Sequence, residues 1–150
     1  MNEERPAVLT GGCQCGNIRF AFYAQPIRVG ICHCRMCQRA TAGAFAGLAD
    51  VPEVDFAWTK GTPKAFQSSS VAERHFCGDC GTPLSYHQLG GANMEILLGA
   101  FDDPSALAPA YAVGIESKVA WFDQLHQLPA KTFAEYAGAD AAASITSNQS

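Results

Sequence analysis

The stretch Cys77-Gly78-Asp79-Cys80-Gly81 ends in the same way as Cys13-Gln14-Cys15-Gly16, with a glycine directly after the second cysteine. A glycine at this place lets the chain turn with a positive φ, so that backbone N–H groups can point at the cysteine sulfurs. The two motifs predict one four-cysteine metal site, formed by Cys13, Cys15, Cys77 and Cys80, between segments more than 60 positions apart. A closed four-ligand site is structural, and its metal adds folding free energy directly.

A third motif, Cys32-His33-Cys34-Arg35-Met36-Cys37, contributes three cysteines and has no glycine after the last one. Thiolate ligands favour soft or borderline metals such as zinc, and three protein ligands leave a position open for water or substrate. Zinc with three thiolates is a poor Lewis acid for a carbonyl, but it can take a thiol as its fourth ligand and keep that thiol deprotonated. The motif therefore favours a second, open zinc site at Cys32, Cys34 and Cys37, suited to a thiol that attacks an aldehyde.

The same three cysteines allow other interpretations, which the sequence leaves open. His33 or His75 could complete a second closed structural site. Cys34 and Cys37 could form a redox pair, although no βαβ pattern surrounds them. An iron–sulfur cluster fits poorly, because it normally needs four cysteines on one cluster. We favour the open zinc site.

The composition is typical of a globular protein. The 150 residues are about enough for one domain, with 48% apolar and 16% charged residues. The formal net charge of −4 argues against a nucleic-acid partner, because phosphate binding usually requires a basic surface. The sequence shows no signal peptide and no apolar run long enough for a membrane span. An odd number of clustered cysteines without an export signal indicates metal binding in a reducing cytoplasm rather than disulfides.

Short runs of apolar and polar residues predict a mainly-β domain. Between residues 17 and 23, Ile18, Phe20 and Phe22 alternate with residues of the opposite strand face. Turns with Gly or Pro separate this run from further predicted strands at residues 44–48, 54–59, 65–68, 71–76, 83–89 and 94–101. Short helices are expected at residues 35–40 and 103–107, the latter from an Asp N-cap followed by Pro. Trp121 and Phe122 are expected to be buried aromatic anchors.

The chain has no linker that would divide it. We therefore expect one domain over residues 1–137. Residues 138–150 have almost nothing to bury and are expected to form a disordered tail.

Three segments carry a family resemblance: residues 12–20 (GCQCGNIRF), 32–39 (CHCRMCQR) and 76–84 (FCGDCGTPL). In their order and spacing they resemble the glutathione-dependent formaldehyde-activating enzyme family, which also includes centromere protein V. Residues 115–122 (IESKVAWF), with Leu128 and Pro129, are similar to the closing motif of that family. The resemblance extends from residue 11 to about residue 133.

The resemblance implies a tent-like fold of two antiparallel sheets with short helices, clasped by zinc. It implies a structural zinc on Cys13, Cys15, Cys77 and Cys80, and a second zinc on Cys32, Cys34 and Cys37. It also implies a carbon–sulfur lyase, of the type that condenses glutathione with formaldehyde to S-hydroxymethylglutathione. The expected partners are a small-molecule thiol and an aldehyde, without nucleic acid or membrane.

Three further residues are candidates for the reaction. His33 lies between two predicted ligands, and in an extended Cys-x-Cys segment its side chain should point away from the metal. It remains a candidate to protonate the alkoxide that the addition produces. Arg35 and Arg39 are candidates to bind the carboxylates of the thiol. Two rival hypotheses are a non-catalytic zinc-binding interaction module and an enzyme of the same chemistry with another thiol or aldehyde.

Overall fold

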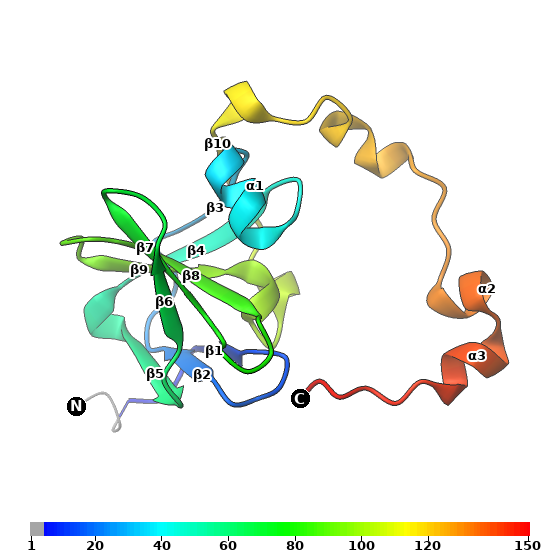
Figure 1. Cartoon of the computed structure of the whole chain (residues 1–150), viewed down its shortest axis with the longest axis horizontal. Coiled ribbons are helices and arrows are strands. Elements are labelled where there is room, and N and C mark those ends of the chain that lie inside the picture. Colours follow the sequence, from blue (N-terminus) through cyan, green and yellow to red (C-terminus); the bar gives the residue numbers. More distant parts are fainter. Residues whose placement is uncertain (1–4) are drawn as a thin grey trace.

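The computed structural model describes residues 5–150, which form two β-sheets and a few short helices (Figure 1). The larger sheet consists of β10 (Tyr111–Val113), β3 (Arg28–Cys32), β4 (Ala46–Pro52), β9 (Asn93–Leu97), β8 (Pro83–Gln88), β7 (Ala72–Phe76) and β6 (Lys64–Gln67), in this order. The smaller sheet consists of β1 (Leu9–Gly12), β2 (Arg19–Phe22) and β5 (Phe56–Lys60). The predicted mainly-β class is confirmed. The paired strands are antiparallel except β10, which runs parallel to β3 at the edge of the larger sheet.

The helices are short and lie outside the sheets. The α-helices are α1 (Arg35–Thr41), α2 (Phe133–Ala137) and α3 (Ala139–Ser144). The 3₁₀ turns are Glu53–Asp55, Leu98–Ala100, Pro104–Ala106, Ile115–Ser117 and Phe122–Gln127. Both predicted short helices are present, the first as α1 and the second as the 3₁₀ turn Pro104–Ala106. Asp103 caps this turn by accepting a hydrogen bond from the Ser105 N–H. No helix within residues 5–150 is long and apolar enough to cross a membrane.

The hydrophobic core lies between the two sheets. Phe20 and Phe22 of β2 are buried, as the alternating pattern predicts, and each ring meets the edge of Phe101 at a centroid distance of 5.1 Å. The larger sheet contributes Val51 and Ile96, both fully buried. Since successive residues of a strand point to opposite faces, the neighbours Asp50 and Glu95 belong to the other face of this sheet. One face of the larger sheet therefore closes the core, and the other is free for a site.

Some predicted elements differ from the structure. β1, β3 and β10 were not predicted, and the strand predicted at residues 94–101 ends at Leu97, where a 3₁₀ turn begins. Trp121 is 53% exposed, so the prediction that it is buried is wrong. Its neighbour Phe122 is half-buried and packs on Phe45 and His33.

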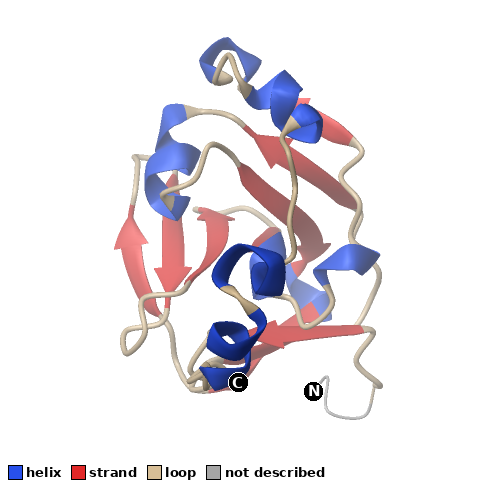
Figure 2. Cartoon of the chain, turned by 90° about the vertical axis from the view of Figure 1, so that its right-hand side faces the viewer, coloured by secondary structure: helices blue, strands red, loops and turns tan. Residues whose placement is uncertain are grey.

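The C-terminal segment runs over the outside of the domain. In Figure 1, α2 and α3 lie apart from both sheets, and Figure 2 shows them in front of the body of the domain. The segment returns to the domain at its end, where the Ser150 N–H donates to the Gln14 carbonyl at 2.7 Å. Within residues 138–150, α3 and the chain that follows it are largely exposed. The domain boundary at residue 137 and the disordered tail beyond it stay predictions.

Gly11 of β1 offers a test of how tightly the sheets pack. A Cβ atom there would lie 2.2 Å from the Ala100 carbonyl oxygen and 2.4 Å from Cζ of Phe20. Backbone cannot yield as a flexible side chain does, so we expect Gly11→Ala to lower the free energy of unfolding by about 1–3 kcal/mol or more. The measurement is urea-induced unfolding of the zinc-loaded protein.

The matched control is Gly99→Ala. A Cβ atom at Gly99 would meet nothing within 4 Å. This variant should unfold within about 0.5 kcal/mol of the parent protein. Equal effects of the two substitutions would contradict the packing described for β1.

Candidate metal centre and adjoining cavity

The four predicted structural ligands come together between the two sheets. Cys13 and Cys15 follow β1 of the smaller sheet, whereas Cys77 and Cys80 lie in the turn between β7 and β8 of the larger one. Their Sγ atoms all lie within 4.8 Å of one another, and all four cysteines are free thiols. The cluster therefore joins the two sheets, as the matched glycines predict.

Both knuckles have the predicted glycine geometry. Gly16 has φ +76° and Gly81 has φ +78°. The Gly16 N–H donates to the Cys13 carbonyl, the Gly81 N–H donates to the Cys77 carbonyl, and the Ile18 N–H donates to Cys13 Sγ at 3.2 Å. The two glycines thus close the turns, and the Ile18 N–H supports the negative charge on the Cys13 sulfur.

The second cluster is formed at the start of α1. Cys32 ends β3, Cys34 is the N-cap of α1, and Cys37 lies in its first turn, where its N–H donates to Cys34 Sγ at 3.3 Å. The three Sγ atoms lie within 4.8 Å of one another. No other His, Cys, Asp or Glu of residues 5–150 joins this group. In this structure neither His33 nor His75 completes the site, so three protein ligands leave it open.

The raised pKa values of two of these thiols indicate that the cluster needs a cation if all three are to ionise. Burial raises the pKa of Cys32 to about 12, opposed by the Cys34 N–H and reinforced by the neighbouring thiols. Burial also raises the pKa of Cys37, although the Arg74 guanidinium acts against it. Three thiols this close cannot all lose their protons unless a metal compensates the charge. The all-sulfur donor sets of both clusters fit zinc, with the first cluster as its closed site and the second as its open one.

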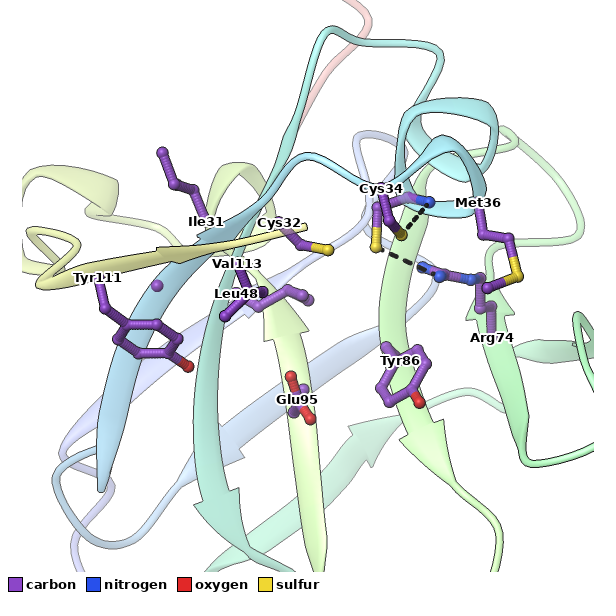
Figure 3. Close-up of a pocket in the computed structure, with 12 residues that line it drawn as sticks. Ile31, Cys32, Cys34, Met36, Leu48, Arg74, Tyr86, Glu95, Tyr111 and Val113 are labelled. Carbon is purple, nitrogen blue, oxygen red and sulfur yellow. Dashed lines mark hydrogen bonds between the residues drawn. The ribbon is translucent and has the colours of Figure 1, made fainter. Parts of the chain in front are cut away.

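A cavity of about 240 Å³ adjoins the open cluster (Figure 3). Its walls are mostly apolar and include Met36, Leu48, Tyr111 and Val113. The Tyr111 ring packs directly on Gly30, where a Cβ atom would lie 2.4 Å from Cζ of that ring. Since Cys32, Cys34 and Cys37 also line this cavity, a ligand bound at them would lie against apolar side chains.

Arg74 of β7 is one of two charged residues in the cavity wall. Its Nη2 donates to Cys37 Sγ at 3.4 Å and its Nε donates to Ser68 Oγ at 3.2 Å. The guanidinium lies 5.1 Å from the centroid of the Tyr86 ring, within the range of a cation–π contact. These three contacts hold the guanidinium beside the cysteine sulfurs.

Glu95 of β9 is the second charged residue in the cavity wall. It pairs across the strands with Tyr86 on one side and Asp50 on the other. Burial raises the pKa of the Glu95 carboxyl, the Asp50 carboxylate raises it further, and Arg28 and Arg74 oppose these effects. Asp50 is buried, and Arg28 Nε donates to its Oδ2 at 2.5 Å. Its Oδ1 has no hydrogen-bond partner within the described residues.

His33 does not line this cavity. It is 1% exposed, and its ring meets the edge of the Phe122 ring at a centroid distance of 4.6 Å. Neither ring nitrogen has a hydrogen-bond partner within residues 5–150. As predicted for the middle residue of Cys-x-Cys, the side chain is directed away from the open site, towards the aromatic side chains Phe45 and Phe122.

Arg35 and Arg39 lie on the exposed side of α1, not in the cavity wall. They line a separate surface hollow with Phe66 and Ser68, and Arg35 donates to Gln38 Oε1. Sequence proximity to the cysteines therefore does not place them beside the cavity. Arg74, almost 40 positions from Cys37 along the chain, is the arginine that contacts the cluster.

Comparison with known proteins agrees with this arrangement. The model of the glutathione-dependent formaldehyde-activating enzyme family matches residues 8–117, which include all seven cysteines. The chain belongs to this family. The matched range also contains Arg74 and Glu95, so the cavity lies within the family domain.

A curated relative and a solved structure are each similar to a part of this chain. Uncharacterized lyase C29B12.13 of Schizosaccharomyces pombe is 29% identical over 83 residues, which are 55% of this chain and 60% of that protein. The chain thus spans about 60% of the length of this curated relative. The crystal structure of a Rhodobacter sphaeroides protein matches with a TM-score of 0.56 at 18% identity, over 69% of this chain and 99% of that chain. This last similarity shows the fold alone.

Substituting one cysteine of each cluster should separate their roles. We expect Cys13→Ser to remove the closed site and to lower the melting temperature strongly or prevent folding, because the metal there contributes folding free energy. Cys37→Ser should lose metal from the open site but keep the fold. Metal content by elemental analysis, together with thermal unfolding by circular dichroism, checks both. Equal losses of stability would contradict the division into a structural and an open site.

Proposed function

We propose that the protein is a zinc-dependent carbon–sulfur lyase that joins a thiol to an aldehyde at Cys32, Cys34 and Cys37, and catalyses the reverse reaction. The main support is that an open three-cysteine cluster shares a cavity with Arg74 and Glu95. The description of the family, and the word lyase in the name of the yeast relative, point in the same direction. Zinc at the four-cysteine cluster has a structural role in this proposal.

The net reaction forms one C–S bond and transfers one proton from the thiol to the carbonyl oxygen, by way of solvent. When bound, zinc at the open site lowers the pKa of the substrate thiol, whose proton passes to solvent. The sulfur then attacks the carbonyl carbon, the C–S bond forms, and the electron pair of the C=O π bond moves to the oxygen. The resulting alkoxide takes a proton and becomes the hydroxyl group of a hemithioacetal. Neither an oxidant nor a reductant is needed.

We assign the proton donor to Glu95 rather than to His33. Glu95 lines the cavity, and burial raises the pKa of its carboxyl, whereas His33 is enclosed by aromatic rings. In the forward direction Glu95 gives its proton to the alkoxide and is reprotonated from solvent. In the reverse direction its carboxylate removes the hydroxyl proton, as microscopic reversibility requires.

The proposed substrates are glutathione and formaldehyde, which the family description names. The cavity has room for a thiol terminus and a small aldehyde, and the rest of a glutathione molecule would extend into solvent. Arg35 and Arg39 could then meet its carboxylates only from outside the cavity, along α1. The same chemistry on another thiol or aldehyde is the alternative that this geometry leaves open.

NMR exchange spectroscopy of glutathione and formaldehyde tests the proposed function directly. The adduct forms spontaneously, so the exchange rate without protein must be subtracted. We expect the zinc-loaded protein to accelerate exchange in proportion to its concentration, and we expect Cys37→Ser to abolish the acceleration. If the protein with both sites loaded has no effect on this pair or on other thiols and aldehydes, the enzyme proposal is wrong.

The Glu95 assignment predicts a pH dependence. The groups that face Glu95 are Asp50, Arg28, Arg74 and Tyr86. Because its pKa is raised, the turnover number at saturating thiol should fall as pH rises through that pKa. Glu95→Gln should lose this dependence and about 10²-fold in rate, as expected for a missing proton donor. The exposed Glu116→Gln is the matched control and should behave as the parent protein does.

Stability offers a second readout for Glu95. A raised pKa in the folded state means that the folded protein binds more protons than the unfolded chain between the two pKa values. The free energy of unfolding should therefore fall as pH rises through this window, and this part of the fall should be absent in Glu95→Gln. Unfolding in urea over a pH series measures it. An unchanged pH profile in Glu95→Gln would show that Glu95 is not the group with the raised pKa.

A further inference from the structure

Within the proposed function, we infer that Arg74 is a catalytic residue that binds the aldehyde oxygen as this oxygen becomes negatively charged. The inference rests on the position of Arg74, whose Nη2 lies 3.4 Å from Cys37 Sγ. A thiol that joins the three cysteines brings its sulfur into the same cluster. When that sulfur attacks a carbonyl carbon, the oxygen is two bonds away from the sulfur. A donor that already contacts the cluster is therefore close to where the oxygen must lie.

The guanidinium is fixed before any ligand binds. Ser68 accepts from Nε, and the face of the guanidinium lies over the Tyr86 ring. Figure 3 shows Arg74 directed at the cysteine sulfurs, with the Tyr86 ring beneath it. Donors that are already oriented stabilise a developing charge without the cost of reorganisation, and in an apolar cavity their effect is larger than in water.

Arg74 has donors available for a ligand. A guanidinium carries more N–H groups than the two hydrogen bonds to Ser68 and Cys37 use. Arg74 is also part of the cavity wall, so it faces the space that a ligand would fill. A role limited to supporting the Cys37 sulfur would not require this access.

The chemistry of the open site requires such a cation. A zinc ion with three thiolates and a fourth sulfur ligand carries excess negative charge and polarises a carbonyl poorly. The oxygen must therefore be stabilised by another positive group. In the cavity wall that group is Arg74, while Glu95, on the far side of Tyr86, supplies the proton.

The bond changes are those of the addition. As the C–S bond forms, the π electron pair of the carbonyl moves to the oxygen, and Arg74 hydrogen-bonds the resulting alkoxide. The proton of Glu95 then passes to the oxygen, and the neutral hydroxyl group leaves Arg74. Arg74 keeps its own protons throughout.

Kinetics of Arg74→Gln and Arg74→Lys test the inference with two thiols, glutathione and the uncharged 2-mercaptoethanol, and formaldehyde. We expect Arg74→Gln to lower kcat about 10²-fold or more with both thiols, as the loss of one oxyanion donor does elsewhere, and to change KM little. Arg74→Lys should recover part of the rate. Arg5→Gln, at an exposed arginine that pairs with Asp55 and lies outside the cavity wall, is the matched control for loss of a positive charge. A loss confined to KM for glutathione would overturn the inference, because Arg74 would then bind a carboxylate of the substrate.

A binding experiment tests Arg74 without any turnover. The chain is loaded with cobalt at both sites, and its absorption spectrum is followed during titration with thioacetate or ethanethiol. Thioacetate places a partly negative oxygen two bonds from its sulfur, and ethanethiol has no such oxygen. We expect Arg74→Gln to reduce the preference for thioacetate over ethanethiol at least 10-fold relative to the parent protein and to Arg5→Gln, with an unchanged cobalt content.

The outcomes separate the inference from the proposed function. An unchanged preference, or the loss of one equivalent of cobalt from Arg74→Gln, would overturn the oxyanion role. In the second case Arg74 would serve to hold Cys37. If formaldehyde does not react but the preference for thioacetate depends on Arg74, the oxyanion site stands and the assignment of formaldehyde fails.

Discussion

The fold depends on charge compensation among four cysteine sulfurs. Cys13 and Cys15 follow the first strand of the smaller sheet, and Cys77 and Cys80 lie in a turn of the larger sheet, so the cluster links one sheet to the other. Thiolates within 4.8 Å of one another repel unless a cation lies among them. A metal ion held by these four cysteines would therefore fix the sheets around Phe20 and Phe22, because Cys13 and Cys77 belong to the same buried core.

The closed core leaves the other face of the larger sheet for chemistry. Successive side chains of a strand point to opposite faces of the sheet. Val51 and Ile96 therefore point to the core, while their neighbours Asp50 and Glu95 belong to the face that carries the cavity. Register then brings distant residues into one row across the sheet. Glu95 pairs with Tyr86, and Tyr86 pairs with Arg74, so two charged groups flank one ring next to the cysteines.

The sequence predicts the parts of the site that depend on local spacing and misses those that depend on register. The cysteine clusters and the positive φ of Gly16 and Gly81 follow from motifs a few residues long. Arg74 and Glu95 could not be found in this way, because a single charge in a short strand resembles an ordinary solvated residue until its cross-strand partners are known. Arg35 and Arg39 seemed better candidates by proximity, but on α1 they line a different hollow. β10 was missed for a related reason: three residues become a strand only beside β3.

Backbone N–H donors support the sulfur charge in both cysteine clusters, but the open cluster also has a guanidinium, and this suits it to the proposed reaction. At Cys13 the support comes from backbone N–H groups such as that of Ile18, which are fixed in position. At Cys37 it comes from Arg74, a side chain whose other N–H groups face a cavity. When a bound sulfur attacks an aldehyde, negative charge moves from the sulfur to an oxygen two bonds away. In the proposed reaction the guanidinium of Arg74 favours the transition state if it binds the developing alkoxide more strongly than it binds the Cys37 sulfur, because only an interaction that strengthens in the transition state raises the rate.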